Sequence, residues 1–221
     1  MQPAVGVRLF APAHINGYIT DGDPLHPWSF RLRWLSRGLK YRAAAMTPLL
    51  SFALQSARPQ ILHETAYGRA RPRVPRTTRV VTTLHDMTVE RYPQWFSNPD
   101  RRIADKLAAL RRADAIVCIS EHTRSDLLAR HSEFSGRCAV VHHGATVPPA
   151  DGLRPAVLPQ RYLLYVGMRQ SYKNFAMLLR ALSVARRLPS SLQLLCLGGG
   201  PFDAGERTLC AKVGWSEPRI I

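Results

Sequence analysis

Short apolar segments alternate with longer amphipathic segments along this chain, a pattern typical of a parallel α/β fold. The apolar segments have the length of strands, and they are rich in β-branched and large aliphatic residues. Strands that are covered by helices on both faces carry such unbroken apolar runs. The pattern therefore predicts strands at residues 5–11, 60–64, 79–84, 115–119, 138–141, 162–166 and 192–197.

Segments with helical periodicity lie between these strands. Leucines recur at the spacing of one helix face within residues 30–42, which predicts a basic helix there. Apolar side chains from Phe175 to Leu182 also fall on one face of a helix. Thr47 and Ser120 each stand before a helical segment and are predicted N-caps. Further helices are predicted at residues 47–57, 98–113, 120–130 and 204–213.

A proline-rich stretch divides the chain into two predicted domains. It contains Pro148, Pro149, Pro155 and Pro159, and it has the composition of a linker. We expect an N-terminal Rossmann-like domain at residues 1–145, a linker at 146–160, and the start of a second Rossmann-like domain at 161–221.

The charge balance is strongly basic, with 31 Lys and Arg against 15 Asp and Glu and a net charge of +16. Nucleic acid, an anionic membrane surface and an anionic substrate all remain open as partners. The densest basic segments, residues 31–42 and 69–79, lack the interleaved aromatic residues of a single-strand-binding surface. We therefore favour an anionic substrate or a membrane surface over nucleic acid.

Other features of the composition indicate a cytoplasmic protein. No apolar run is long enough to span a bilayer, and no secretory signal peptide is visible at the N-terminus. The four cysteines are scattered and form no C-x-x-C pair, so we expect small core residues in a reducing compartment.

The segment YLLYVGMRQSYKNF is the strongest candidate for a binding loop. It predicts a buried strand, then Gly167, then a loop with Arg169 and Lys173 ahead of a helix. Ligands of open α/β sheets bind at the carboxyl edge, where such a loop lies. Two cations near a helix N-terminus suit a diphosphate. The alternative is a solvated basic loop without a ligand.

Histidines follow two other predicted strands. His85 and Asp86 come directly after residues 79–84, where a histidine can hydrogen-bond a substrate hydroxyl or phosphate. A turn capped by this pair is the alternative. His142 and His143 are adjacent, so their side chains cannot both point one way from an extended backbone, and a two-histidine metal site is not expected.

The glycine run at residues 198–200 allows either a tight turn or the approach of a nucleotide to backbone amides, and we favour the turn. Gly198 and Gly199 stay candidate cleft residues. No Walker-type phosphate loop, G-x-S-x-G elbow or H-E-x-x-H zinc motif occurs in the chain.

Several of these segments together resemble the retaining nucleotide-sugar glycosyltransferases of family four. They are TTLHDMTVERYPQWF, ADAIVCISEHTRSDLL, VVHHG, YLLYVGMRQSYKNFAMLLRAL and LLCLGGG, in this order and spacing. The resemblance is nearest to the bacterial mannosyltransferase-like branch. It covers residue 60 to the C-terminus and, more weakly, the segment around Phe10.

The resemblance implies a GT-B fold, in which two Rossmann-like domains face each other across a cleft. The acceptor, a glycan or a lipid-linked molecule, would bind mainly the first domain, and the nucleotide sugar mainly the second. Gly167, Arg169 and Lys173 match the loop that holds the donor diphosphate, and His85 matches a cleft histidine near the donor sugar. Neither a metal nor another cofactor is expected. A peripheral contact with the inner face of the plasma membrane is a further expectation.

The chain also departs from the family pattern. The family carries a pair of glutamates at fixed spacing that holds the donor, whereas Glu206 and Glu217, the glutamates beyond Lys173, lack that spacing. The segment INGYITDGDP does not resemble the family's first glycine-rich loop. We therefore expect an incomplete copy of the enzyme. A non-catalytic α/β binding module, a nucleic-acid binder and an epimerase-like sugar-nucleotide enzyme remain alternatives.

Overall fold

A computed structural model describes residues 47–67, 71–144, 158–169, 171–185, 187–215 and 220. The predicted strand at residues 5–11 and the predicted helix at 30–42 lie outside these residues, as does most of the proline-rich stretch. The chain divides into two compact units, and the main body of the first ends at Gly144.

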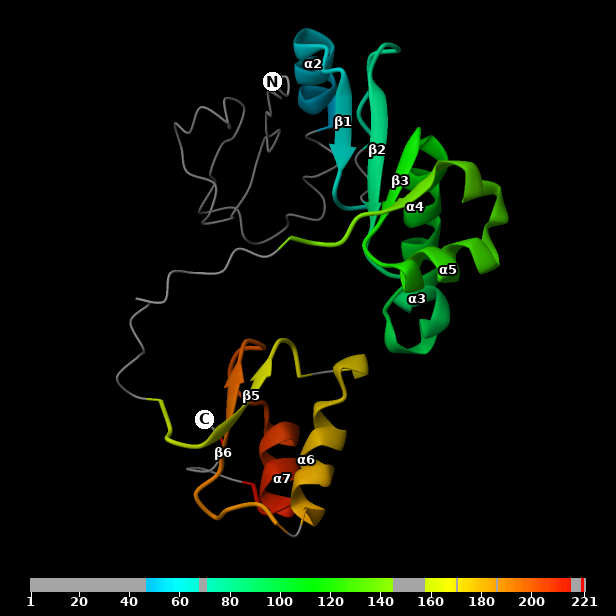
Figure 1. The fold of residues 1–221 in the computed structure, drawn as a ribbon. Helices are drawn as coiled ribbons and strands as arrows, with labels where there is room; N and C mark the ends of the chain where they lie inside the picture. Colours follow the sequence, from blue (N-terminus) through cyan, green and yellow to red (C-terminus); the bar gives the residue numbers. More distant parts are fainter. Residues whose placement is uncertain are drawn as a thin grey trace, which may run out of the picture. The chain divides into compact units, whose positions relative to one another are not determined.

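The first unit is built on a four-stranded parallel sheet with the strand order β1-β2-β3-β4 (Figure 1). Cα partners such as Leu84 and Cys118 fix the register between β2 and β3. Because all neighbouring strands pair in parallel, the four carboxyl ends lie at one edge of the sheet. They are β1 (Ile61–Glu64), β2 (Arg79–Leu84), β3 (Ala115–Cys118) and β4 (Cys138–Val140).

Helices follow and precede these strands as the sequence predicts. They are α2 (Thr47–Ala57), α3 (Thr88–Arg91), α4 (Pro99–Arg112) and α5 (Glu121–Arg130), with short 3-10 helices at Pro93–Trp95 and Ser132–Arg137. Three predicted helices are confirmed within a residue or two at each end. The prediction of Thr47 as an N-cap is wrong, because α2 begins at Thr47 itself. The one-turn helix α3 is too short to show a periodic pattern.

The core of the first unit lies between the sheet and its helices. The main cluster draws on α4, α5, β2, β3 and the segment after α5, and its largest fully buried side chains are Leu84, Leu110, Ile116, Leu127 and Phe134. Ser120 caps α5, because its Oγ accepts the backbone N–H of Thr123 at 3.1 Å. This confirms the predicted N-cap and fixes the chain where it leaves β3.

The second unit contains a two-stranded parallel sheet of β5 (Tyr162–Val166) and β6 (Gln193–Leu197). Helices α6 (Phe175–Val184) and α7 (Ala204–Lys212) lie beside it, and a 3-10 turn covers Ser171–Lys173 (Figure 1). Phe175, Leu179 and Trp215 are buried in the core. The α/β class with parallel sheets is thus confirmed in both units.

Strand β5 has the predicted bounds, but the prediction that it is buried is wrong. Leu164 and Val166 are 54% and 64% exposed, and Leu197 in β6 is 62% exposed. Tyr165 instead packs against the Phe175 ring, with the ring centroids 5.1 Å apart. The helices of the described residues therefore cover one face of this sheet, whereas an apolar strand pattern predicts cover on both.

All four cysteines are free, and Cys118 and Cys210 are buried. Burial raises the pKa of the Cys118 thiol to about 12. This is the environment of an unreactive core thiol rather than of a nucleophile. Among the described helices, none is both long enough and apolar enough to cross a membrane.

We predict that Ser120→Ala lowers the free energy of unfolding by about 1 kcal/mol, because the amide of Thr123 loses its cap. Urea denaturation followed by circular dichroism measures the change. Ser125 is exposed within the same helix, so Ser125→Ala is the matched control and should stay within about 0.5 kcal/mol of the parent. Equal effects of the two substitutions would contradict the capping role.

Candidate functional site

The carboxyl edge of the first sheet brings together side chains that are distant in sequence. His85 and Asp86 follow β2, Ser120 follows β3, and His142 and His143 follow β4. His85 and His143 lie in contact, with their rings stacked at a centroid distance of 5.6 Å and an interplanar angle of 27°. The His142 side chain makes a different contact, because its Nδ1 lies 3.1 Å from the carbonyl oxygen of Ile119.

His85 is held by contacts to both its ring and its backbone. Its Nε2 lies 2.8 Å from the carbonyl oxygen of Thr65, and its backbone N–H donates to the Tyr67 hydroxyl at 2.9 Å. The hydroxyl of Thr123 donates to the His85 carbonyl at 3.4 Å. The segment after β1 and the first turn of α5 therefore both fix His85 at the end of β2.

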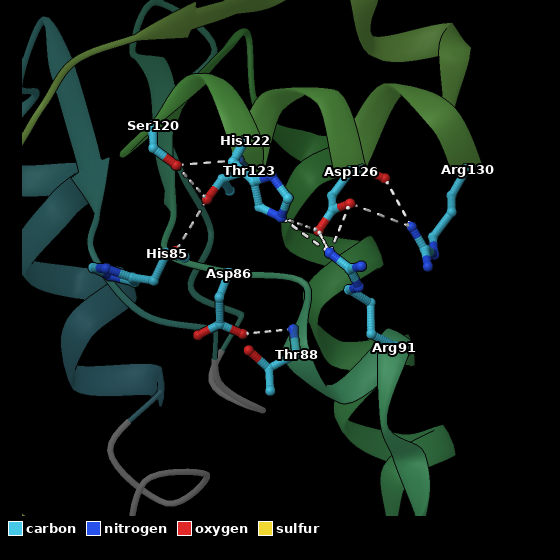
Figure 2. A network of polar contacts seen from close by, with 9 residues as sticks. All are labelled: His85, Asp86, Thr88, Arg91, Ser120, His122, Thr123, Asp126 and Arg130. Atoms are coloured by element: carbon cyan, nitrogen blue, oxygen red, sulfur yellow. Dashed lines mark hydrogen bonds and ion pairs between the residues drawn. The ribbon is translucent and has the colours of Figure 1, made fainter. Parts of the chain in front are cut away.

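Asp86 shapes the turn that follows β2. Its Oδ1 accepts the backbone N–H of Thr88 at 2.9 Å, and its carbonyl accepts from Nζ of Lys106 at 2.8 Å. Figure 2 shows its side chain leaving the strand end in a different direction from His85. The alternative interpretation of this pair, a capped turn, is therefore present, and the exposed carboxylate has a second oxygen that a ligand could contact.

A buried ion pair lies beneath this edge. Nζ of Lys106 contacts Oε2 of Glu90 at 2.9 Å, and the two side chains are only 5% and 6% exposed. The same ammonium lies 5.6 Å from the ring centroid of Tyr67. Burial raises the pKa of Tyr67 well above its usual range, so the phenol stays protonated near neutral pH. The pair ties α3 and α4 to the strand end that carries His85.

A second polar cluster links α3 to α5 on the surface of the first unit. Nη1 of Arg91 donates to Asp126 at 3.0 Å and to Nε2 of His122 at 3.0 Å. Arg130 also approaches Asp126, at 4.0 Å (Figure 2). Exposed pairs of this kind contribute little each to stability, and the cluster fixes how α3 lies against α5.

In the second unit, the loops after β5 and β6 contact each other at the carboxyl edge. Gly167 has a φ of +120°, and the glycines at 198, 199 and 200 have φ values of +94°, +77° and +70°. Side-chain-bearing residues rarely adopt such angles. A Cβ atom on Gly199 would lie 3.0 Å from Nη1 of Arg169 and 3.3 Å from the Gly167 carbonyl oxygen. The glycine run therefore serves as a tight turn that packs closely against the first loop.

Arg169 does not offer a free fork of donors in this structure. Its side chain is 2% exposed, and it pairs with Glu206 through Nε–Oε1 at 2.9 Å and Nη2–Oε2 at 3.2 Å. Nη1 donates to the Gly198 carbonyl at 2.8 Å, and Nη2 donates to the Gly200 and Pro201 carbonyls at 2.9 and 3.1 Å. The guanidinium also lies 4.2 Å from the Phe202 ring centroid.

These contacts give Arg169 a structural function that the sequence reasoning did not include. The guanidinium binds the carbonyl groups of the glycine turn and the first turn of α7 at the same time. Glu206 is held in turn by a capping box, in which Asp203 accepts the Glu206 N–H and Glu206 accepts the Asp203 N–H. Lys173, by contrast, is exposed, and its Nζ lies 5.1 Å from the Tyr172 ring centroid.

Sequence reasoning missed the groups that hold the predicted site residues in place. Tyr67, Glu90, Lys106 and Glu206 lie far in sequence from the residues that they contact. Only Glu206 carried a local signal, because Asp203 followed three residues later by glutamate is a capping-box pattern. Among the described residues, no group of His, Cys, Asp and Glu side chains is arranged to hold a metal ion.

A comparison with one solved structure supports the fold, and a second structure aligns less well. An S. aureus MnaA–UDP co-structure aligns with a TM-score of 0.51 at 14% identity, covering 82% of this chain and 52% of that chain. A glycosyltransferase from Rickettsia africae ESF-5 aligns with a TM-score of 0.48 at 14% identity, covering 87% of this chain and 53% of that one. The chain therefore spans about half the length of these proteins. A search of curated proteins found no match.

The family comparison covers well over half of the chain. The family model described as Glycosyltransferase Family 4 matches residues 7–147, a range that includes the entire described part of the first unit. The match contains His85 and Asp86 and ends before the loop with Gly167, Arg169 and Lys173. On this basis the chain belongs to Glycosyltransferase Family 4.

Proposed function

We propose that this chain is part of an enzyme that transfers a sugar from a nucleotide-sugar donor to an acceptor. Membership of Glycosyltransferase Family 4 makes a sugar-transfer function the leading interpretation. The proposal that the chain binds the donor rests on the pair of loops at the carboxyl edge of β5 and β6. There Arg169 closes the glycine turn, and an exposed Lys173 lies on the adjoining loop.

Lys173 is the residue that we assign to direct contact with the donor diphosphate. Its ammonium is exposed at the edge where open α/β sheets bind their ligands. When the bond between the sugar and the diphosphate breaks, negative charge develops on the leaving phosphate. A cation at this position stabilises that charge, because it interacts more strongly with the leaving group than with the intact donor.

Arg169 is assigned a positioning role beside the predicted phosphate contact. Its guanidinium orders residues 198–201 through their carbonyl groups, which brings that turn against Gly167. Direct contact with phosphate would require Arg169 to give up its bonds to Glu206 or to the turn. The Glu206 pairing therefore competes with a phosphate for the same donors.

The first unit is assigned the acceptor, and the nucleotide sugar is assigned mainly to the second unit, as the family resemblance implies. His85, fixed at the end of β2, is the proposed catalytic-site contact to the sugar, with Asp86 beside it. A retaining reaction, mannose as the sugar, a glycan or lipid-linked acceptor, and peripheral attachment to the inner face of the plasma membrane extend the proposal. These finer points rest on the sequence resemblance alone.

Lys173→Ala should weaken binding of a nucleoside diphosphate by about ten- to a hundredfold, since one hydrogen bond to a charged group is lost. Isothermal titration calorimetry of the 221-residue chain with UDP and with GDP measures the change. Lys212→Ala removes an exposed cation from the last turn of α7 and is the matched control. Binding that is absent in the parent chain would favour a non-catalytic α/β module.

Glu206→Ala should lower the free energy of unfolding by about 3–5 kcal/mol, because it leaves the buried Arg169 guanidinium without its carboxylate. Arg207 is exposed in the same helix, and Arg207→Ala should change stability by no more than about 0.5 kcal/mol. Urea denaturation gives both values.

A second substitution of Glu206 distinguishes between two roles for Arg169. If Arg169 positions the glycine turn, Glu206→Gln loosens the turn and weakens diphosphate binding. If Arg169 is instead a phosphate ligand restrained by Glu206, the substitution frees the guanidinium and strengthens binding. Isothermal titration calorimetry shows whether the substitution weakens or strengthens UDP binding, and stronger binding would overturn the positioning role.

A further inference from the structure

Helix α2 presents apolar side chains to solvent as well as to the core of the first unit. Leu49 and Phe52 are 58% and 66% exposed, whereas Leu54 on the opposite face is fully buried. Residues at i and i+3 share one face of a helix, so Leu49 and Phe52 lie side by side. The helix therefore carries a second, outward-facing apolar patch that the described part of the chain does not cover.

A segment rich in proline and arginine lies along this helix. The backbone N–H of Arg73 donates to Oγ of Ser51 at 2.9 Å, and Nε2 of Gln55 donates to the Arg73 carbonyl at 3.3 Å. Ser51 and Gln55 lie one turn apart on the flank of the face that carries Phe52. The segment thus borders the apolar patch, and its exposed guanidinium groups are those of Arg71, Arg73 and Arg76.

Acidic side chains do not balance the charge of this region. Residues 24–85 contain 11 Lys and Arg and a single acidic residue, Glu64, so they supply +10 of the net charge of +16. Glu64 is itself paired with Arg112 of α4. In the part of the chain that the structure describes, the exposed arginines at 71, 73 and 76 form no ion pair. Their charge is therefore available to an external anion.

We infer that Leu49, Phe52, Arg71, Arg73 and Arg76 form one docking surface, the α2 surface, for an anionic lipid bilayer. The two apolar side chains enter the headgroup region, and the arginines contact lipid phosphates. The inference rests on the peripheral attachment that the proposed function includes. It adds the residues that make the contact and the class of lipid that they select.

The combination of groups favours a bilayer over other anionic partners. The negative potential of an anionic leaflet attracts nearby cations, and apolar side chains on a helix gain by leaving water for the acyl boundary. Nucleic acid would use the arginines and could stack on Phe52, but it offers little to the aliphatic side chain of Leu49. A folded acidic protein would have to match the shape of the α2 surface, which a fluid bilayer does not need to do.

Vesicle co-sedimentation of the full 221-residue chain tests the arginines without any nucleotide. We expect binding to vesicles with about one-third phosphatidylglycerol, and binding weaker by about tenfold or more to pure phosphatidylcholine. Arg73→Gln combined with Arg76→Gln should weaken binding to the anionic vesicles by about ten- to thirtyfold. Arg111→Gln combined with Arg207→Gln removes the same charge from exposed positions elsewhere and should weaken it by less than about threefold.

A second pair of variants tests the apolar contact. Leu49→Ser combined with Phe52→Ser should weaken vesicle binding by about tenfold, and raising the salt concentration should not abolish this difference, because apolar burial is not screened. Val141→Ser combined with Met177→Ser changes exposed apolar side chains outside the α2 surface and should have little effect. Circular dichroism checks that each variant keeps its secondary structure.

The vesicle experiment and UDP calorimetry separate failure of the inference from failure of the proposed function. Equal losses in the surface variants and their controls would mean that net charge alone drives binding, which overturns the inference. Absence of binding to anionic vesicles overturns it as well, also where the chain instead binds a DNA duplex through the same arginines. If the chain binds no UDP, the proposed function loses its support, and the vesicle experiment still decides whether the α2 surface docks on a bilayer.

Discussion

Parallel pairing of the strands is the constraint on which both candidate loop clusters depend. In each sheet it places every carboxyl end at the same edge, so residues far apart in sequence meet there. In the first unit this brings His143 against His85, and in the second it brings Gly167 against the glycine turn. Chemistry-bearing residues in this fold therefore follow strand ends, whatever their distance along the chain.

Both units place a buried ion pair beneath that edge. Lys106 with Glu90 holds the turn after β2, and Arg169 with Glu206 holds the turn after β6. In each case the cation also donates to backbone carbonyls of the loop. These hydrogen bonds replace the ones to water that the cation gives up when it is buried. A buried cation near a candidate site can thus order the backbone of the loop itself.

Local sequence signals predict most of the described elements, although not the one-turn helix α3, and they do not predict these contacts. The apolar and β-branched run of β2, the N-cap of α5 and the glycine turn at 198–200 each depend on neighbouring residues, and the structure confirms them. The burial of β5 was predicted wrongly, because cover on a sheet face comes from other elements. The partners of His85 and Arg169 lie 20 and 37 residues away, where spacing carries no information about contact.

The proposed function requires the carboxyl edge of β5 and β6 to bind a nucleoside diphosphate. Hydrogen exchange of the chain with and without UDP is the measurement to make for this edge, because protection reports which backbone amides become ordered. We predict slower exchange in peptides that cover residues 167–169 and 198–202, with no change at the end of β2. Protection confined to the first unit, or no protection at saturating UDP, would rule out a diphosphate site at this edge.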